Sequence, residues 1–188
     1  ARYRQGMSTM KIDRIHHVAY RCRDAKETVL WYSQMLKMDF VLAIAEDQVP
    51  STKAPDPYMH IFMDAGNGNV LAFFELPTQP PMGRDPNTPA WVQHIAFRVK
   101  DRAELLEFKA HLEANGVDVL GVTDHGAFHS IYFFDPNGHR IELACPDPDE
   151  EAMIKRLDAV KWDMLEDWSK TKRAPKHAAF LHEREFQQ

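Results

Sequence analysis

The chain has 188 residues, of which 44% are hydrophobic and 27% charged, so it can fold around one core or as two small modules. Its formal net charge of −5 argues against nucleic acid or an anionic membrane as a partner, and no apolar run approaches the roughly 20 residues of a spanning helix. The N-terminal residues lack the apolar stretch of a secretion signal, and two cysteines, Cys22 and Cys145, are too few for a disulfide framework, so we expect a reducing, cytoplasmic location.

A repeat runs through most of the chain. Residues 16–22 read HHVAYRC and residues 93–99 read QHIAFRV, at an offset of 94 − 17 = 77. The register continues without a gap into a D-x-x-E pattern, which begins at Asp24 in the first copy and at Asp101 in the second. Such a pattern is close to a helix capping box. A match that extends from a strand through a cap into a helix predicts two copies of one module.

The elements of each copy follow in the same order. Copy one reads as a strand at 16–22, a helix to about Lys37 and strands near 38–46, 58–64 and 69–76. Copy two reads as a strand at 93–99, a helix ended by Asn115-Gly116 and strands near 117–122, 129–134 and 139–144. The Pro-rich segment between the copies reads as a linker.

These patterns predict an α+β protein in which two βαβββ modules are followed by a C-terminal helix. We expect an N-terminal tail at 1–11, the first module at 12–76, a linker at 77–90, the second module at 91–146, and a C-terminal helix and tail at 147–188. The helix, from 149 to 169, is amphipathic and can pack on the core or on a second subunit. That apolar stripe offers a surface for a homodimer.

Three residues predict a metal site. His17 and His94 are equivalent in the repeat, and Glu142 lies in an apolar strand, flanked by Ile141 and Leu143. Burying two imidazoles and a carboxylate requires partners for each, and one divalent cation satisfies all three. Two histidines and one carboxylate form the facial triad that leaves coordination positions open.

The number of protein ligands separates two kinds of chemistry. Glu75 is the obvious candidate for a fourth ligand, but aligning the two copies places Ala72 or Phe73 opposite Glu142, and only a shifted register brings in Glu75. Four ligands favour a Lewis-acid metal, whereas three favour Fe(II) with substrate and O₂ bound together.

The motifs HHVAY, QHIAFRV and HSIYFFDPNGHRIEL resemble the vicinal oxygen chelate superfamily, which includes glyoxalases, bleomycin-resistance proteins and type I extradiol dioxygenases. The resemblance covers about residues 12–146 and is strongest to the dioxygenases, whose active-site tyrosine lies ten residues before the glutamate ligand. Tyr132 and Glu142 have that spacing (142 − 132 = 10). The resemblance implies paired βαβββ modules that form a cup around a metal held by His17, His94 and Glu142.

The resemblance also implies an Fe(II)-dependent oxidoreductase that opens the ring of a small catecholic substrate with O₂, as in aromatic catabolism. Tyr132 would then hydrogen-bond the bound oxygen or substrate. The histidine that dioxygenases usually carry nine residues before this tyrosine is Thr123 here, so His125 and His129 are candidates to replace it, and His60 is the candidate acid or base. The alternative is a lyase or isomerase of the glyoxalase or epimerase kind that uses Mn, Zn, Ni or Co. A non-catalytic drug binder would need no metal triad.

Overall fold

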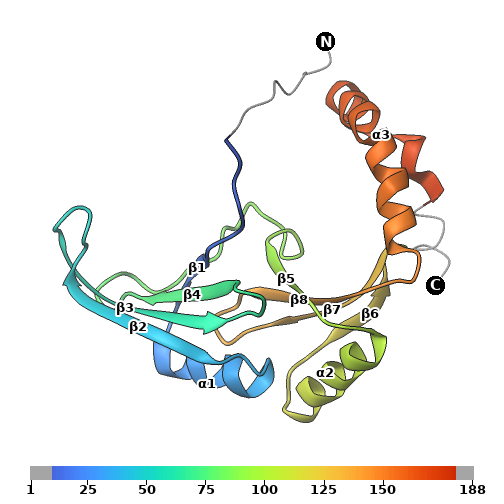
Figure 1. The fold of residues 1–188 in the computed structure, drawn as a ribbon. Helices are drawn as coiled ribbons and strands as arrows, with labels where there is room; N and C mark the ends of the chain where they lie inside the picture. Colours follow the sequence, from blue (N-terminus) through green and yellow to red (C-terminus); the bar gives the residue numbers. More distant parts are fainter. Residues whose placement is uncertain (1–9, 181–188) are drawn as a thin grey trace. The chain divides into compact units, whose positions relative to one another are not determined.

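The computed structural model describes residues 10–180. Most of the expected N-terminal tail and the last eight residues of the C-terminal tail lie outside the described residues. The chain divides into two compact units, Ala1–Met82 and Gly83–Gln188, and each is described by itself. Figure 1 shows the elements of both units in chain order.

Each unit contains one four-stranded sheet. In the first, β1 (Val18–Cys22) is followed by α1 (Ala25–Met35), β2 (Phe40–Gln48), β3 (Pro55–Asp64) and β4 (Val70–Glu75), and the strands lie in the order β1-β4-β3-β2. In the second, β5 (His94–Arg98) is followed by α2 (Arg102–Ala114), β6 (Leu120–Asp124), β7 (Phe128–Phe134) and β8 (Arg140–Pro146), in the order β5-β8-β7-β6. The α+β fold with two βαβββ modules is confirmed.

The two module helices begin where the capping pattern predicts. The Asp24 carboxylate accepts the Glu27 N–H at 2.7 Å, and the Asp101 carboxylate accepts the Glu104 N–H at 3.0 Å. Each side chain satisfies an N–H that has no partner inside the helix, which contributes about 1 kcal/mol per cap. Asn115 is the C-cap of α2, and Gly116 follows with a φ of +79°, a conformation that glycine adopts without strain.

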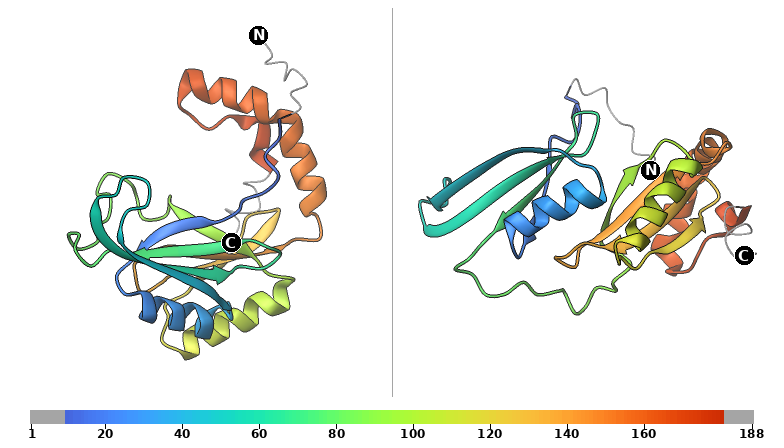
Figure 2. Two further views of the ribbon diagram at one scale, coloured as in Figure 1. Left: turned by 60° about the vertical axis from the view of Figure 1, so that its left-hand side comes forward. Right: turned by 90° about the horizontal axis from the view of Figure 1, so that it is seen from below.

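Each module helix covers one face of its own sheet (Figure 2). In the first unit the Tyr32 ring of α1 packs on Phe73 of β4, with centroids 5.0 Å apart. Because successive strand residues point to opposite faces, Ala72 faces away from α1. By the same alternation Ile141 and Leu143 share one face of β8 and Glu142 lies on the other. We call the face opposite the module helix the helix-free face of each sheet.

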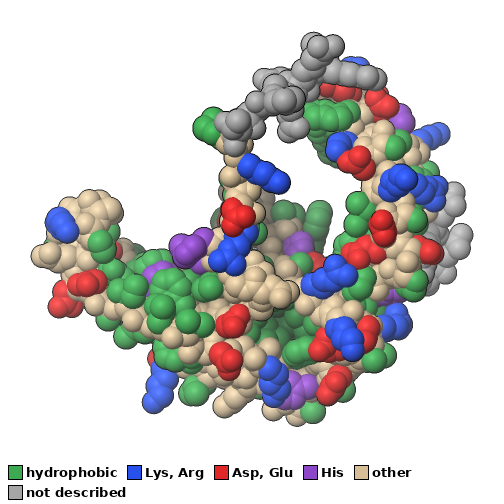
Figure 3. Space-filling view, in the orientation of Figure 1, with side chains coloured by type: hydrophobic (Ala, Val, Ile, Leu, Met, Phe, Trp, Pro, Cys, Tyr) green, Lys and Arg blue, Asp and Glu red, His purple; other side chains and the backbone are tan. Residues whose placement is uncertain are grey.

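Several strands depart from the expected boundaries. Strand β1 begins at Val18 rather than 16, which leaves His17 just before it, and β3 begins at Pro55 rather than 58. Strand β6 begins at Leu120 rather than 117, and its pairing with β7 is interrupted between Gly121 and Thr123. At Gly121, φ is +107° and a Cβ would lie 2.6 Å from the Ser130 carbonyl oxygen, so only glycine fits this close approach. Strand β2 extends to Gln48, and all its residues are exposed. Figure 3 shows hydrophobic side chains gathered over β2 and β3.

The expected C-terminal helix is α3 (Glu150–Thr171), and a short 3₁₀ turn, η1 (Lys176–Ala178), follows it. None of the residues of α3 is buried. Its predicted apolar stripe is half-buried at Met153, Leu157, Val160 and Met164 and exposed at Leu165 and Trp168, and Ile154 and Trp162 are exposed outside the stripe. The expected homodimer is a prediction that these exposed side chains motivate. Within residues 10–180, no helix has the length and apolar character needed to cross a membrane.

Candidate metal centre

Glu142 occupies the middle of β8 on the helix-free face of the second unit and is 4% exposed. Its Oε1 accepts a hydrogen bond from the Ser130 hydroxyl at 2.5 Å and another from the Tyr132 hydroxyl at 3.2 Å. Its Oε2 lies 2.9 Å from Nε2 of His94. The two hydroxyls therefore hold one carboxylate oxygen and leave the other directed at the histidine. A buried carboxylate in this arrangement requires positive charge beside its second oxygen.

The His94 ring is oriented by the backbone. Its Nδ1 lies 2.9 Å from the carbonyl oxygen of Val92, which can only accept, so Nδ1 carries the proton. In the neutral ring the nitrogen that faces Glu142 is then an unprotonated lone pair. A lone pair and a carboxylate oxygen at 2.9 Å repel each other unless a proton or a metal cation compensates them. Ligating histidines typically donate their second N–H in this way, so the pair fits a divalent metal.

Tyr132 and His125 extend the site along the same face. The Tyr132 hydroxyl oxygen lies 2.7 Å from Nε2 of His125, which the loop between β6 and β7 carries. Burial and the negative charge of Glu142 raise the pKa of Tyr132 to about 12. The phenol therefore keeps its proton at neutral pH and donates it in the hydrogen bond to Oε1 of Glu142.

His129 lies elsewhere. It alternates with Ser130 and Tyr132 along β7, so its side chain points to the opposite face of the sheet. There its ring nitrogens lie 3.6 Å from a carboxylate oxygen of Asp124 and 3.7 Å from one of Asp147. This position separates it from Glu142 and favours a structural, ion-pairing role over the expected catalytic one.

His17 and His60 come together on the helix-free face of the first unit. The His17 ring, directly before β1, lies 6.4 Å from the His60 ring between centroids, and its Nδ1 is 2.9 Å from Nδ1 of His16. His60 is 8% exposed and stacks on Phe74 at 3.5 Å, with Nδ1 3.0 Å from the Phe73 carbonyl oxygen. Desolvation by burial lowers the pKa of His60, so its ring is neutral at physiological pH.

Strand pairing shows which residue of the first unit corresponds to Glu142. Ala96 pairs with Glu142 in the parallel ladder of β5 and β8, and Ala19, its repeat equivalent (96 − 77 = 19), pairs with Ala72. This register selects Ala72 from the two expected alternatives. With β4 and β8 aligned in this way (142 − 72 = 70), Phe62 corresponds to Tyr132 (132 − 62 = 70) and His60 to Ser130 (130 − 60 = 70).

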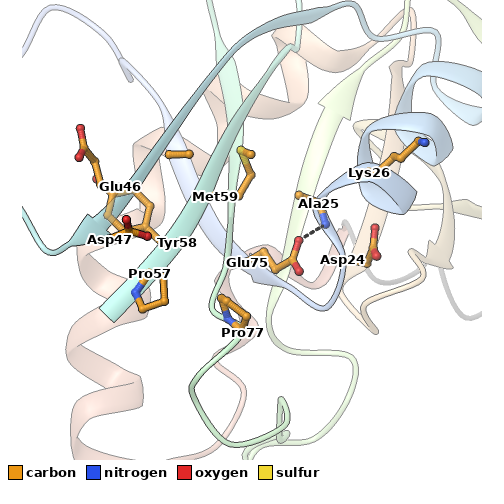
Figure 4. A pocket seen from close by; sticks show the side chains of 11 residues that line it. Asp24, Ala25, Lys26, Glu46, Asp47, Pro57, Tyr58, Met59, Glu75 and Pro77 are labelled. Atoms are coloured by element: carbon orange, nitrogen blue, oxygen red, sulfur yellow. Dashed lines mark hydrogen bonds between the residues drawn. The ribbon is translucent and has the colours of Figure 1, made fainter. Parts of the chain in front are cut away.

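The carboxylate of Glu75 has a different role. Its Oε2 accepts the backbone N–H of Ala25 at 2.7 Å, at the start of α1 (Figure 4). Because Glu75 alternates with Phe74 along β4, it lies on the helix-covered face with Phe73. The structure therefore supports the expectation that Glu75 is not a fourth ligand.

Ser130 is the site residue that the sequence analysis missed. It is fully buried, and its hydroxyl makes the shorter of the two side-chain bonds to Oε1 of Glu142. Its position two residues before Tyr132, hence on the same strand face, was the available signal.

Among residues 10–180, His, Cys, Asp and Glu side chains form no group of three or more that could hold a metal. Nε2 of His94 and Oε2 of Glu142 lie 2.9 Å apart in the second unit, whereas His17 belongs to the first unit.

Comparison with protein-family models identifies one superfamily to which the chain is similar. The model described as Glyoxalase/Bleomycin resistance protein/Dioxygenase superfamily matches residues 14–143. A curated protein of Bacillus subtilis (strain 168), "Putative ring-cleaving dioxygenase MhqA", is 27% identical over 88 residues, which are 47% of this chain. The chain spans only 28% of the length of that relative.

Solved structures share the fold. The fosfomycin resistance protein FosX of Listeria monocytogenes, complexed with Mn(II) and sulfate, is 18% identical and has a TM-score of 0.54, covering 76% of this chain and 99% of FosX. Lactoylglutathione lyase of Agrobacterium tumefaciens is 20% identical, with a TM-score of 0.50, covering 72% of this chain and 96% of the lyase. At these identities the likeness concerns the fold alone.

Proposed function

The chain belongs to the glyoxalase/bleomycin resistance protein/dioxygenase superfamily, and we propose that it is an Fe(II)-dependent extradiol-type dioxygenase that cleaves a small catecholic substrate with O₂. In this proposal His17, His94 and Glu142 hold the metal. The observation that carries it is the register that places Ala72, a side chain without a donor atom, at the repeat position of Glu142. Three protein ligands favour a metal that binds substrate and O₂ together.

The arrangement around Glu142 supports a metal ligand rather than a structural carboxylate. The Ser130 and Tyr132 hydroxyls donate to Oε1, which leaves Oε2 to bind the cation. The Val92 carbonyl accepts from Nδ1 of His94, so Nε2 is the unprotonated nitrogen that can bind the same cation. An Fe(II) ion bound there would supply open coordination positions at which a catechol and O₂ can meet. The partial similarity to the Bacillus subtilis relative points in the same direction.

The remaining residues have distinct roles in the proposal. When substrate binds, the Tyr132 hydroxyl turns its one proton from Oε1 of Glu142 to substrate oxygen, and Nε2 of His125, 2.7 Å from the Tyr132 oxygen, donates a hydrogen bond to that oxygen. Neutral His60 lies beside His17 and serves as the second candidate base. His129, between two carboxylates on the opposite face, keeps its segment in place.

A lyase or isomerase that uses Mn, Zn, Ni or Co is the second candidate, because the structural relatives include a lyase and a Mn(II) complex of FosX. The two functions differ in O₂ consumption. The protein is purified anaerobically and loaded with Fe(II), and O₂ uptake is then measured with a panel of catechols. Uptake that requires both Fe(II) and a catechol, and that is absent with Mn or Zn, supports the dioxygenase. No uptake with any catechol rejects it.

We also propose that the enzyme acts in the cytoplasm as a homodimer. The exposed apolar side chains of α3 are the candidate interface, because Trp162 and Trp168 are 59% and 47% exposed. Sedimentation of the wild type and of Trp162→Glu tests the dimer. A wild type that sediments as a monomer at micromolar concentration rejects it.

A further inference from the structure

Two arginines on the helix-free face of the second unit have no role in the proposed metal chemistry. The Arg140 guanidinium lies 4.1 Å from the centroid of the Tyr132 ring, and one of its nitrogens donates to the Trp91 carbonyl at 2.8 Å. The Arg84 guanidinium lies 5.6 Å from the centroid of Phe134 and donates to the Ala90 carbonyl at 3.3 Å. Both arginines thus lie over an aromatic ring of β7 and bind the segment before β5.

The two arginines are neighbours. Arg140 pairs directly with Phe134 in the antiparallel ladder of β7 and β8, and side chains of paired residues lie roughly 5 Å apart. Arg84 covers the ring of that same Phe134. Two guanidinium groups therefore flank one aromatic side chain, next to the tyrosine that contacts Glu142.

Among the described residues, no carboxylate pairs with either guanidinium. Among residues 10–180, Arg84 and Arg140 form no ion pair, whereas Arg98 of the same unit lies 3.6 Å from Glu150. A guanidinium has five N–H donors in a planar fork, and one carbonyl uses only part of that capacity.

A cavity in the same unit opens beside Arg140. Its lining includes Tyr132, Phe134 and Arg140, so an aromatic surface, a hydroxyl and a cation border one space. Glu113 and Asp118 also line it, and Lys109 pairs with Glu113 at 3.2 Å. Because Tyr132 contacts both Glu142 and Arg140, we expect a ring bound at the proposed metal to lie within reach of Arg140, with Arg84 on the far side of Phe134.

We propose that Arg84 and Arg140 form an anion subsite that selects a catechol bearing a carboxylate. The inference rests on the proposed function for the position of the diol. The planar carboxylate matches the guanidinium fork, and the aromatic rings beneath the arginines hold the forks in place. A neutral catechol would leave both cations without a partner.

Anaerobic calorimetry tests this with three probes, which are 3,4-dihydroxybenzoate, catechol and benzoate. With Fe(II)-loaded wild type we expect 3,4-dihydroxybenzoate to bind about 10- to 100-fold more tightly than catechol, the range of a charge-assisted contact. In the double variant R84Q/R140Q the preference should fall below about threefold, while catechol binds as before. The control variant Arg102→Gln, on α2, should keep the full preference.

The outcomes separate the two proposals. If catechols consume O₂ but the wild type shows no preference for the carboxylate, or the preference survives in R84Q/R140Q, the anion subsite is rejected and the dioxygenase stands. If neither diol is turned over but benzoate binds the wild type and not the double variant, the subsite stands and the dioxygenase falls. The single variant Arg84→Gln keeps the Arg140–Tyr132 contact. Its thermal unfolding is compared with that of the wild type, so that a loss of preference is not mistaken for misfolding. No binding of any probe rejects the subsite.

Discussion

Removing the Ser130 hydroxyl tests the core of the proposed metal centre. Ser130→Ala deletes the 2.5 Å hydrogen bond to Oε1 of Glu142 and leaves that oxygen with Tyr132 alone, at 3.2 Å. Ser130 is fully buried, so bulk water does not replace the lost donor. The carboxylate then gains freedom to rotate, and Oε2 loses its fixed direction toward His94.

The expected size of the effect follows from the kind of bond. A hydrogen bond to a charged group contributes about 1.5–3 kcal/mol, and each 1.4 kcal/mol is a factor of ten in affinity. We therefore expect metal binding to weaken roughly 10- to 100-fold, the usual cost of removing a partner behind a metal ligand. Competition with a chromophoric chelator under anaerobic conditions measures it for Fe(II) and Mn(II).

A matched variant separates a local effect from general destabilisation. Thr28 is also buried and also loses a hydroxyl bond when changed to Val, because its Oγ1 donates to the Asp24 carbonyl at 2.7 Å. Thr28→Val should lower the melting temperature without changing metal affinity. Equal losses of metal affinity in the two variants, or less than a threefold loss in Ser130→Ala, would refute the role given to Ser130.

Three further predictions concern neighbouring groups. His94→Ala removes a proposed ligand and should abolish metal retention through purification, and unchanged metal content by mass spectrometry would contradict the triad. Glu75→Gln weakens the charge at the N-terminus of α1 and should cost about 0.3–1 kcal/mol in urea unfolding, with metal affinity unchanged. The folded-state pKa of Tyr132, about 12, exceeds its ordinary value near 10, so this group contributes stability below pH 10 that is lost as pH rises toward 12. Titration at 295 nm should therefore show no difference between the wild type and Tyr132→Phe below pH 10, and a difference with a midpoint near 10 would contradict the shift.

Much of the fold was predictable because its signals are local. The Asp24 and Asp101 caps, and the Gly116 that follows α2, are set by a few adjacent residues whose chemistry allows few alternatives. The repeat strengthened each prediction, because the same pattern occurs in both copies. The start of β6 was misplaced because a positive φ at Gly121 and an interrupted ladder depend on close contact with β7.

The site was harder to predict because it depends on contacts across the sheet. The pairing of His94 with Glu142 followed from the repeat and from a charge in an apolar strand. The role of Glu75 could not be read in advance, because its partner, the Ala25 amide, lies 50 positions earlier in the chain. His129 was expected near the site, but a shift of one residue along a strand moves a side chain to the opposite face.

The two copies differ most where the proposed chemistry is decided. Positions that carry a carboxylate and a phenol in the second unit carry Ala72 and Phe62 in the first. Restoring the missing carboxylate should change the chemistry, because a fourth ligand occupies a position that substrate or O₂ would need. Ala72→Glu should therefore bind Mn and Zn more tightly and lose catechol-dependent O₂ uptake.

Ala72 is fully buried, so a larger side chain there costs about 1–3 kcal/mol through overpacking alone. Ala72→Leu is the matched control, since it adds comparable volume without a donor atom and should weaken uptake without raising metal affinity. If Glu and Leu at this position give the same metal affinity and the same residual uptake, Ala72 does not lie at the open corner. The three-ligand argument for oxygen chemistry would then be wrong, even with His94 and Glu142 correctly assigned.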